Sequence, residues 1–224
     1  MRLLQNLLCI GALLASFGAG AAETAPEPKN GQQFTTLAEQ QNTDGGSKVE
    51  VVEFFAYYCP HCNSFEPKLA EWVRQQGDKI VFKRVHVGGG GGAAQQQHLF
   101  YTLDALGLVP QYHAKVFGAI HDEHQRLNTE EQVLDWVAKA GIDRAKYSAA
   151  ASSFGVQAKL RRANSMMSDY KIEYWPQIAI DGHYLTSPSM VGETMPSSTE
   201  PAQQQAVLKV MDYLLAKAQA EKKR

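Results

Sequence analysis

The chain has 224 residues, of which 44% are hydrophobic and 20% are charged, and its formal net charge is −1 at pH 7. This length suits one large domain, or one domain that carries a sizeable insertion, and the composition is that of a globular protein. Because no long block of like charges occurs, nucleic acid and anionic membrane surfaces are not expected as partners.

Residues 1–22 predict a signal peptide. Arg2 precedes an apolar run over residues 7–17, and small residues at 19–21 form an A-x-A-like cleavage site. The run is too short to span a bilayer, although a short hydrophobic anchor is the alternative. No other stretch is hydrophobic enough to cross a membrane. We therefore expect a soluble periplasmic protein, secreted across the inner membrane. Cleavage would also remove Cys9 and leave two cysteines in a compartment where disulfides persist.

The rest of the chain predicts the order strand, helix, strand, several helices, hairpin and helix. Residues 23–46 are polar and broken by Pro and Gly, with at most one short strand. The β-branched and aromatic residues of 48–58 predict a buried strand, and 78–87 predict a second. Helical spacing then dominates as far as about residue 170, before a hairpin and an amphipathic helix from Pro201 onward.

A run of glycines at 88–92 separates the second strand from the helical region. Glycine has no side chain to pack and loses much conformational entropy on folding. The run predicts either a flexible hinge between two parts of the molecule or a merely permissive loop.

Cys59 and Cys62 stand in the sequence Cys-Pro-His-Cys, at the junction of the first strand and its helix. A disulfide that served only as a staple would close a loop nearly as small as a loop can be. The chain-entropy treatment gives such a loop roughly 2 kcal/mol, so a structural bridge is disfavoured.

A metal site is the second reading of the pair. A lone C-x-x-C supplies two ligands, whereas a structural zinc site has four. The histidines that could complete one are His61, His86, His98, His113, His121 and His124. No second C-x-x-C or compact histidine pair stands out, so we expect no bound metal.

Redox chemistry is the third reading, and the local features favour it. Unpaired N–H groups and the dipole at a helix N-terminus stabilise a thiolate at Cys59. Pro60 is tolerated in the first turn, and His61 adds a positive or hydrogen-bond-donating neighbour. Stabilising the thiolate stabilises the reduced form, which makes the disulfide an oxidant. Cys59 is then the exposed nucleophile and Cys62 the buried resolving thiol.

The stretch VVEFFAYYCPHCNSFEP, residues 51–67, resembles the active site of the DsbA family of periplasmic oxidases. The resemblance extends over most of the chain after residue 22, and is specific at the active site but loose in the helices. It implies an α/β thioredoxin fold with an inserted helical domain. The implied divisions are a leader over 23–46, a first thioredoxin part over 47–92, a helical insertion over 93–170 and a second thioredoxin part over 171–224.

The resemblance also implies residue roles. Cys59 and Cys62 match the catalytic pair, with Pro60 and His61 as the dipeptide between them, and Glu53 matches a buried acid that assists proton transfer to and from the resolving cysteine. Burial in an apolar strand would independently raise the pKa of Glu53, although an exposed edge glutamate is the alternative. Either Lys83 or Arg84 would supply the cation that family members often place on the next strand, and the sequence leaves this choice open.

Trp175-Pro176 matches the loop in which the family has a cis-proline opposite the disulfide. A cis bond there would leave the backbone of Trp175 free to pair with a substrate strand; an ordinary trans proline is the alternative. A small or β-branched residue usually precedes this proline, so Trp175 departs from the family pattern, and this departure puts redox tuning and substrate fit in question.

We therefore predict a thiol oxidase that passes the Cys59–Cys62 disulfide to reduced or unfolded secreted proteins through a mixed disulfide at Cys59. The resemblance implies a quinone-linked membrane protein that reoxidises it, and we expect a monomer without a cofactor. A reductase or isomerase of the same fold is one alternative, although the chain has no obvious dimerisation module for an isomerase. A non-catalytic periplasmic metal-binding protein is the alternative from another class.

Overall fold

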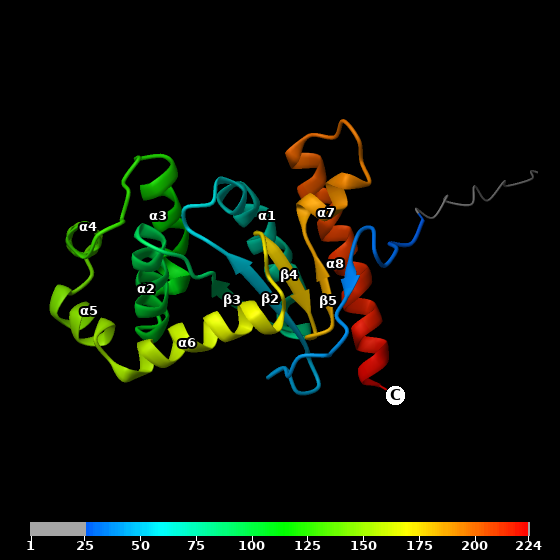
Figure 1. The fold of residues 1–224 in the computed structure, drawn as a ribbon, viewed down its shortest axis with the longest axis horizontal. Coiled ribbons are helices and arrows are strands. Elements are labelled where there is room, and N and C mark those ends of the chain that lie inside the picture. Colours follow the sequence, from blue (N-terminus) through cyan, green and yellow to red (C-terminus); the bar gives the residue numbers. More distant parts are fainter. Residues whose placement is uncertain (1–25, 224) are drawn as a thin grey trace, which may run out of the picture.

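A computed structural model describes residues 26–223 of the chain (Figure 1). The predicted signal peptide lies outside these residues. None of the helices within the described range is long and apolar enough to cross a membrane.

Five strands and eight α-helices form the described part of the chain. The strands are β1 (Thr35–Thr36), β2 (Val49–Phe55), β3 (Ile80–His86), β4 (Gln177–Ile180) and β5 (Tyr184–Thr186). The helices are α1 (Pro60–Gln76), α2 (Gly92–Ala105), α3 (Val109–His121), α4 (Glu130–Lys139), α5 (Arg144–Ala151), α6 (Phe154–Asp169), α7 (Pro188–Glu193) and α8 (Glu200–Lys222), and a 3-10 turn, η1 (Gly77–Lys79), follows α1. This order confirms the predicted sequence of elements.

The strands form one mixed sheet in the order β1-β5-β4-β2-β3. Strand β2 lies inside it, parallel to β3 and antiparallel to β4, and all of its residues are buried. A strand that is buried along its whole length is typical of a sheet covered on both faces, although β2 includes the buried acids Glu50 and Glu53. The active-site stretch therefore follows directly from a fully buried strand.

Two apolar cores lie against the sheet. One contains Val49 and Val51 and packs against α1 and α8, and the other contains Val52 and Phe54 and packs against the helical region. Alternate residues of a strand point to opposite faces, which explains this division. Figure 1 shows α2 to α5 gathered at one end of the molecule, the sheet in the middle and α8 at the other end.

The glycine run 88–92 is shaped by packing and backbone conformation. A Cβ on Gly88 would lie 2.6 Å from Oδ1 of Asn164, and one on Gly92 would collide with the side chain of Asn128. Gly91 has a φ of 59°, in the left-handed region that favours glycine. Much of the run is therefore required by close contacts, which the permissive-loop interpretation did not foresee.

The predicted hairpin is present between β4 and β5. Asp181 and Gly182 at its turn have φ values of 51° and 66°. Two successive positive φ values are characteristic of the tight hairpin turns for which Asp-Gly is favoured. The hairpin places Pro176 immediately before β4, and thus beside β2 and the cysteine pair.

Candidate functional site

Cys59 caps the N-terminus of α1. Its backbone is extended, with φ −83° and ψ 116°, and its Sγ accepts the backbone N–H of Cys62 at 3.3 Å. Pro60 occupies the start of the helix, where no intrahelical N–H is needed. Both cysteines are free thiols in this structure, so the site is described in its dithiol form.

The two sulfurs have opposite proton affinities. Hydrogen bonding from Cys62 lowers the pKa of Cys59 to about 7 against the opposing effect of burial, and the backbone N–H and charge of His61 assist. Burial raises the pKa of Cys62 well above its ordinary value, and the charges of Cys59 and Glu53 add to that rise. Cys59 is therefore the better nucleophile and leaving group, and Cys62 holds its proton.

Cys59 is less open than the sequence suggested. It is 6% exposed, and Cys62 is 0% exposed. The reason lies across the site, where the Cys59 thiol donates to the backbone carbonyl of Trp175 at 3.7 Å. The loop before β4 thus lies against the nucleophilic sulfur.

The Trp175-Pro176 peptide bond is cis, as the resemblance implied. The Trp175 ring stands edge-on to Tyr58, with ring centroids 6.2 Å apart and an interplanar angle of 86°. Together the two rings form an aromatic wall beside the cysteines.

His61, the histidine between the two cysteines, forms a hydrogen bond with the last helix, α8. His61 Nδ1 lies 3.0 Å from Oε1 of Glu200, and the same oxygen accepts Ser64 Oγ at 2.6 Å and Gln204 Nε2 at 3.1 Å. The hydrogen bond that Glu200 accepts from His61 raises the pKa of His61. The sequence prediction missed Glu200, whose only local signal is its place as the acid in the first turn of α8.

Glu53 lies within β2 and is 0% exposed, which confirms the predicted burial. Its Oε2 accepts Arg84 Nε at 3.0 Å. Arg84 is therefore the cation on the next strand, because Lys83 instead pairs with Asp44 at 2.5 Å and Glu50 at 2.7 Å.

A second buried acid joins this cluster. Glu66 of α1 accepts Arg84 Nη2 on Oε1 at 2.7 Å. Its other oxygen lies 3.4 Å from Nε2 of His113, an ion-pair distance without hydrogen-bond alignment. Glu66 stood within the quoted motif without a predicted role. Its position four residues after Cys62 in α1 is a signal that it shares the buried face.

The two acids differ in proton affinity. Burial raises the pKa of Glu53 to about 8, against the opposing charge of Arg84. Burial also acts to raise the pKa of Glu66, but the nearby His113 ring and the charge of Arg84 outweigh it and lower that pKa. At neutral pH Glu53 is the protonated acid and Glu66 the carboxylate.

Glu53, Glu66 and His113 also have the residue types of a metal site, with one ligand atom from each lying within 4.8 Å of the others. The guanidinium of Arg84 already bonds to both carboxylates and supplies a fixed positive charge. Neither cysteine belongs to this group, so within residues 26–223 the geometry does not add ligands to the C-x-x-C.

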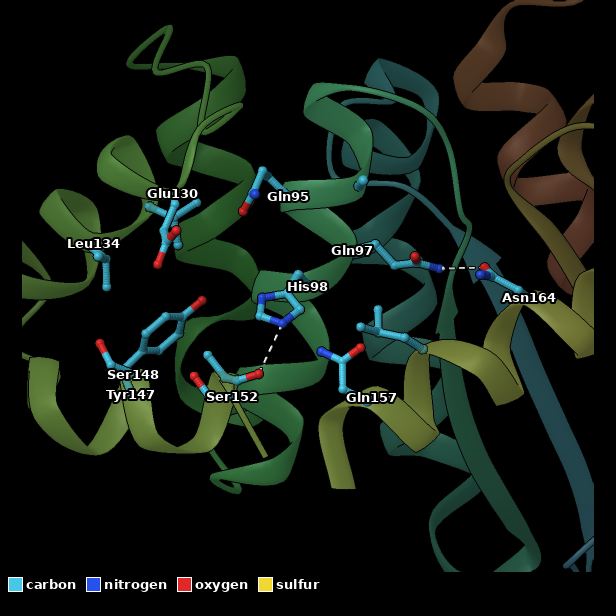
Figure 2. Close-up of a pocket in the computed structure, with 14 residues that line it drawn as sticks. Gln95, Gln97, His98, Glu130, Leu134, Tyr147, Ser148, Ser152, Gln157 and Asn164 are labelled. Carbon is cyan, nitrogen blue, oxygen red and sulfur yellow. Dashed lines mark hydrogen bonds between the residues drawn. The ribbon is translucent and has the colours of Figure 1, made fainter. Parts of the chain in front are cut away.

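A separate cavity of about 520 Å³ lies in the helical region, as Figure 2 shows. Its polar lining includes Gln95, His98 and Glu130, and His98 Nε2 lies 3.1 Å from the carbonyl oxygen of Ala151. None of the residues around the cysteines contributes to this cavity.

Comparison with known proteins shows the affiliation of the chain. The family model of the DSBA-like thioredoxin domain matches residues 50–198. The chain belongs to this family. The Bordetella parapertussis thiol:disulfide interchange protein DsbA is 35% identical over 194 residues, which cover 87% of this chain and 88% of that protein. Its Burkholderia cepacia counterpart is 34% identical over 217 residues, covering 95% and 98%.

Solved structures of the family agree in fold. The crystal structure of Pseudomonas aeruginosa DsbA superposes with a TM-score of 0.78 at 29% identity, covering 87% of this chain and 96% of that one. The chain thus has the thioredoxin-like DsbA fold and is a thiol:disulfide oxidoreductase with disulfide oxidase function. The reductase, isomerase and metal-binding alternatives are not favoured.

Proposed function

We propose that the oxidised Cys59–Cys62 pair donates its disulfide to reduced or unfolded secreted proteins through a mixed disulfide at Cys59. The observation that carries this proposal is the contrast between the two sulfurs. Cys59 lies at the helix cap with a lowered pKa and faces the Trp175 carbonyl, whereas Cys62 is buried with a raised pKa.

In the first step a substrate thiolate attacks Cys59 Sγ. A bond forms between the two sulfurs, the Cys59–Cys62 bond breaks, and Cys62 leaves with the electron pair. The carboxylic acid of Glu53 then gives its proton to the Cys62 thiolate. The pKa of about 8 at Glu53 supports this role, because the group keeps a proton at neutral pH but can release it.

In the second step another substrate thiolate attacks the substrate sulfur of the mixed disulfide. The substrate gains a disulfide, Cys59 leaves as a thiolate, and the oxidoreductase is reduced by two electrons. Hydrogen bonds from Cys62 to Cys59 stabilise this leaving group, and a thiol of lower pKa leaves faster.

The substrate chain would lie against the loop of Trp175 and Pro176. The Trp175 carbonyl lies 3.7 Å from Cys59 Sγ, so a substrate segment at Cys59 would lie beside this backbone and could pair with it, in the manner of a strand added to an edge. The aromatic wall of Trp175 and Tyr58 is suited to the apolar side chains of unfolded chains.

The place and partners of this activity are also part of the proposal. The predicted signal peptide at residues 1–22 supports a periplasmic protein, and family membership supports reoxidation by a quinone-linked membrane protein. We propose that the protein works as a monomer, since one chain contains both cysteines and the loop opposite them.

Trapping the mixed disulfide tests this function. We expect the Cys59 thiolate of a Cys62→Ser variant to attack a peptide whose cysteine is held as a mixed disulfide with an aromatic thiol. The aromatic thiolate leaves and a stable peptide–Cys59 disulfide remains, whereas Cys59→Ser should form no such adduct. Mass spectrometry of the adducts reads the result. Adduct formation at Cys62 in the Cys59→Ser variant, at a rate similar to that of Cys59, would overturn the assignment.

A further inference from the structure

Two buried acids and one fixed cation lie behind the cysteines. Arg84 donates from Nε to Glu53 at 3.0 Å and from Nη2 to Glu66 at 2.7 Å, so it serves both carboxyl groups. Two nearby carboxylates in a desolvated site do not both ionise readily, because like charges repel. One proton is therefore shared between them, and Arg84 alone does not decide which acid carries it.

His113 breaks this symmetry. It belongs to α3 in the helical region, and its side chain is buried, with the ring of Phe55 packed 5.0 Å away between centroids. Its Nδ1 lies 3.0 Å from the hydroxyl of Tyr57, and its Nε2 lies 3.4 Å from Glu66 Oε2. His113 faces Glu66 in this way, and no such contact reaches Glu53.

The direction of the hydrogen bond between Tyr57 and His113 Nδ1 fixes which nitrogen of the ring carries the proton. Burial raises the pKa of the Tyr57 phenol well above its ordinary value, so its hydroxyl stays protonated and is able to donate to Nδ1; we assign this direction to the bond. Burial also lowers the pKa of His113, so the ring is neutral and carries one proton. That proton then lies on Nε2, which faces Glu66.

We propose that His113 is a positioning residue for disulfide exchange, which directs the shared proton to Glu53 by presenting an N–H to Glu66. Each acid accepts one hydrogen bond from Arg84, and the second oxygen of each has no aligned hydrogen bond. The difference between them is His113, whose Nε2 lies 3.4 Å from Glu66 Oε2 and favours a carboxylate there. This inference rests on the proposed function, in which Glu53 protonates Cys62.

The proton that Cys62 needs comes from Glu53. When the Cys62 thiolate leaves, the O–H bond of Glu53 breaks and the S–H bond of Cys62 forms. Glu53 becomes a carboxylate that Arg84 stabilises, and a proton from solvent later restores the acid. The helical region thus contributes a residue that acts on the chemistry of the thioredoxin part.

The surrounding titratable groups agree with this assignment. The pKa of Glu53 is raised and that of Glu66 is lowered. His86, which packs against Tyr57, stays neutral because burial lowers its pKa to about 3. The titratable and charged groups that face the cluster are Tyr57 after β2, Cys59, Cys62 and Glu66 of the α1 end, Arg84 and His86 of β3, and His113 of α3.

Three variants separate positioning from simple packing. His113→Phe keeps a ring in the core but removes both nitrogens, and His113→Gln restores one donor and one acceptor. Tyr112→Phe is the matched control, because it removes a different, partly buried hydrogen bond made by α3, to the Ala140 carbonyl at 3.2 Å.

Carboxyl-carbon NMR titration of Glu53 and Glu66 reads the proton directly, without turnover. We expect His113→Phe to raise the pKa of Glu66 and lower that of Glu53, and His113→Gln to reverse most of both changes. Each unit by which the pKa of Glu53 falls below the working pH reduces its protonated fraction about tenfold. The rate of peptide oxidation should fall with it.

Unchanged titrations in His113→Phe, or equal changes in Tyr112→Phe, would overturn the inference. Should His113→Phe not fold, nitrogen NMR of the unaltered protein still decides, because a proton on Nδ1 of His113 contradicts the proposed arrangement. These readouts are independent of the trapping experiment, so failure of the trap would remove the proposed function without altering the proton assignment.

Discussion

At the scale of single residues, the chemistry depends on unequal surroundings for identical side chains. Cys59 receives N–H donors at a helix cap while Cys62 is desolvated. Arg84 donates to both Glu53 and Glu66, but only Glu66 also has His113 Nε2 within 3.4 Å. Pairs of titratable groups with pKa values pushed apart are the usual arrangement of acid and base roles. In the cysteine pair, Cys62 holds its proton and Cys59 is the stabilised thiolate. In the acid pair, Glu53 holds its proton and Glu66 is the carboxylate.

Replacing Glu53 with Gln tests the cost of its burial. The raised pKa means that the folded protein holds a proton that the unfolded chain releases, so stability is lost as the pH rises from about 4.3, the ordinary value, to about 8. Gln does not ionise, and Glu53→Gln should escape this loss. By urea unfolding, we expect the variant to become more stable than the original protein by on the order of a few kcal/mol at the upper end of this range.

Glu71→Gln, at an exposed position of α1, is the control, since the hydrogen bonds of Glu71 among the described side chains go to Arg74 and Gln75 alone. It should follow the pH dependence of the original protein. A Glu53→Gln curve that runs parallel to the original across the same pH range would contradict a raised pKa at Glu53.

Glu200→Gln tests the hydrogen bond between His61, in the dipeptide between the cysteines, and Glu200 of α8. Without the carboxylate, His61 loses the partner that raises its pKa, so NMR titration of the imidazole should give a lower value. The pair is exposed, and the free energy of unfolding should change by no more than about 1 kcal/mol. The same Glu71→Gln variant removes an equal charge elsewhere and should leave His61 unchanged. A His61 titration unaffected by Glu200→Gln would show that the contact does not persist in solution.

At the scale of elements, the glycine run joins β3 to α2 through contacts that leave little room for side chains. We expect Gly92→Ala to destabilise the protein by about 1–3 kcal/mol, the usual effect of overpacking, because its methyl group would collide with Asn128. Gly90 has open space around it, and Gly90→Ala should stay within about 0.5 kcal/mol of the original protein. Thermal or urea unfolding compares the two. Equal effects would mean that the run behaves as an unconstrained loop.

Local patterns were sufficient to predict the order of strands and helices and the strand-to-helix position of Cys59. They were not sufficient for contacts between distant segments. Glu200 is 139 residues from His61, and His113 reaches the acids from a helix whose placement depends on tertiary packing. The choice between Lys83 and Arg84 also needed the structure. Adjacent strand residues point to opposite faces, and the sequence did not show which face held Glu53.

At the scale of the whole molecule, the redox role depends on how strongly folding favours the dithiol. The lowered pKa of Cys59 stabilises the reduced protein. This contribution is fully present above the ordinary cysteine pKa of about 8.5 and is lost as the pH falls through about 7. The disulfide form has no thiol to titrate and gains nothing from it. Stabilisation of the reduced form is what makes the disulfide a better oxidant.

The most direct test of this account is the pH titration of the Cys59 thiolate, followed by its ultraviolet absorbance in the reduced protein, with the Cys59→Ser variant as the blank. We predict a midpoint near 7, below the ordinary value for cysteine, and no second thiolate until well above that value, because burial raises the pKa of Cys62. A midpoint at or above the ordinary cysteine value would contradict the assignment of Cys59 as the stabilised thiolate of a disulfide oxidase.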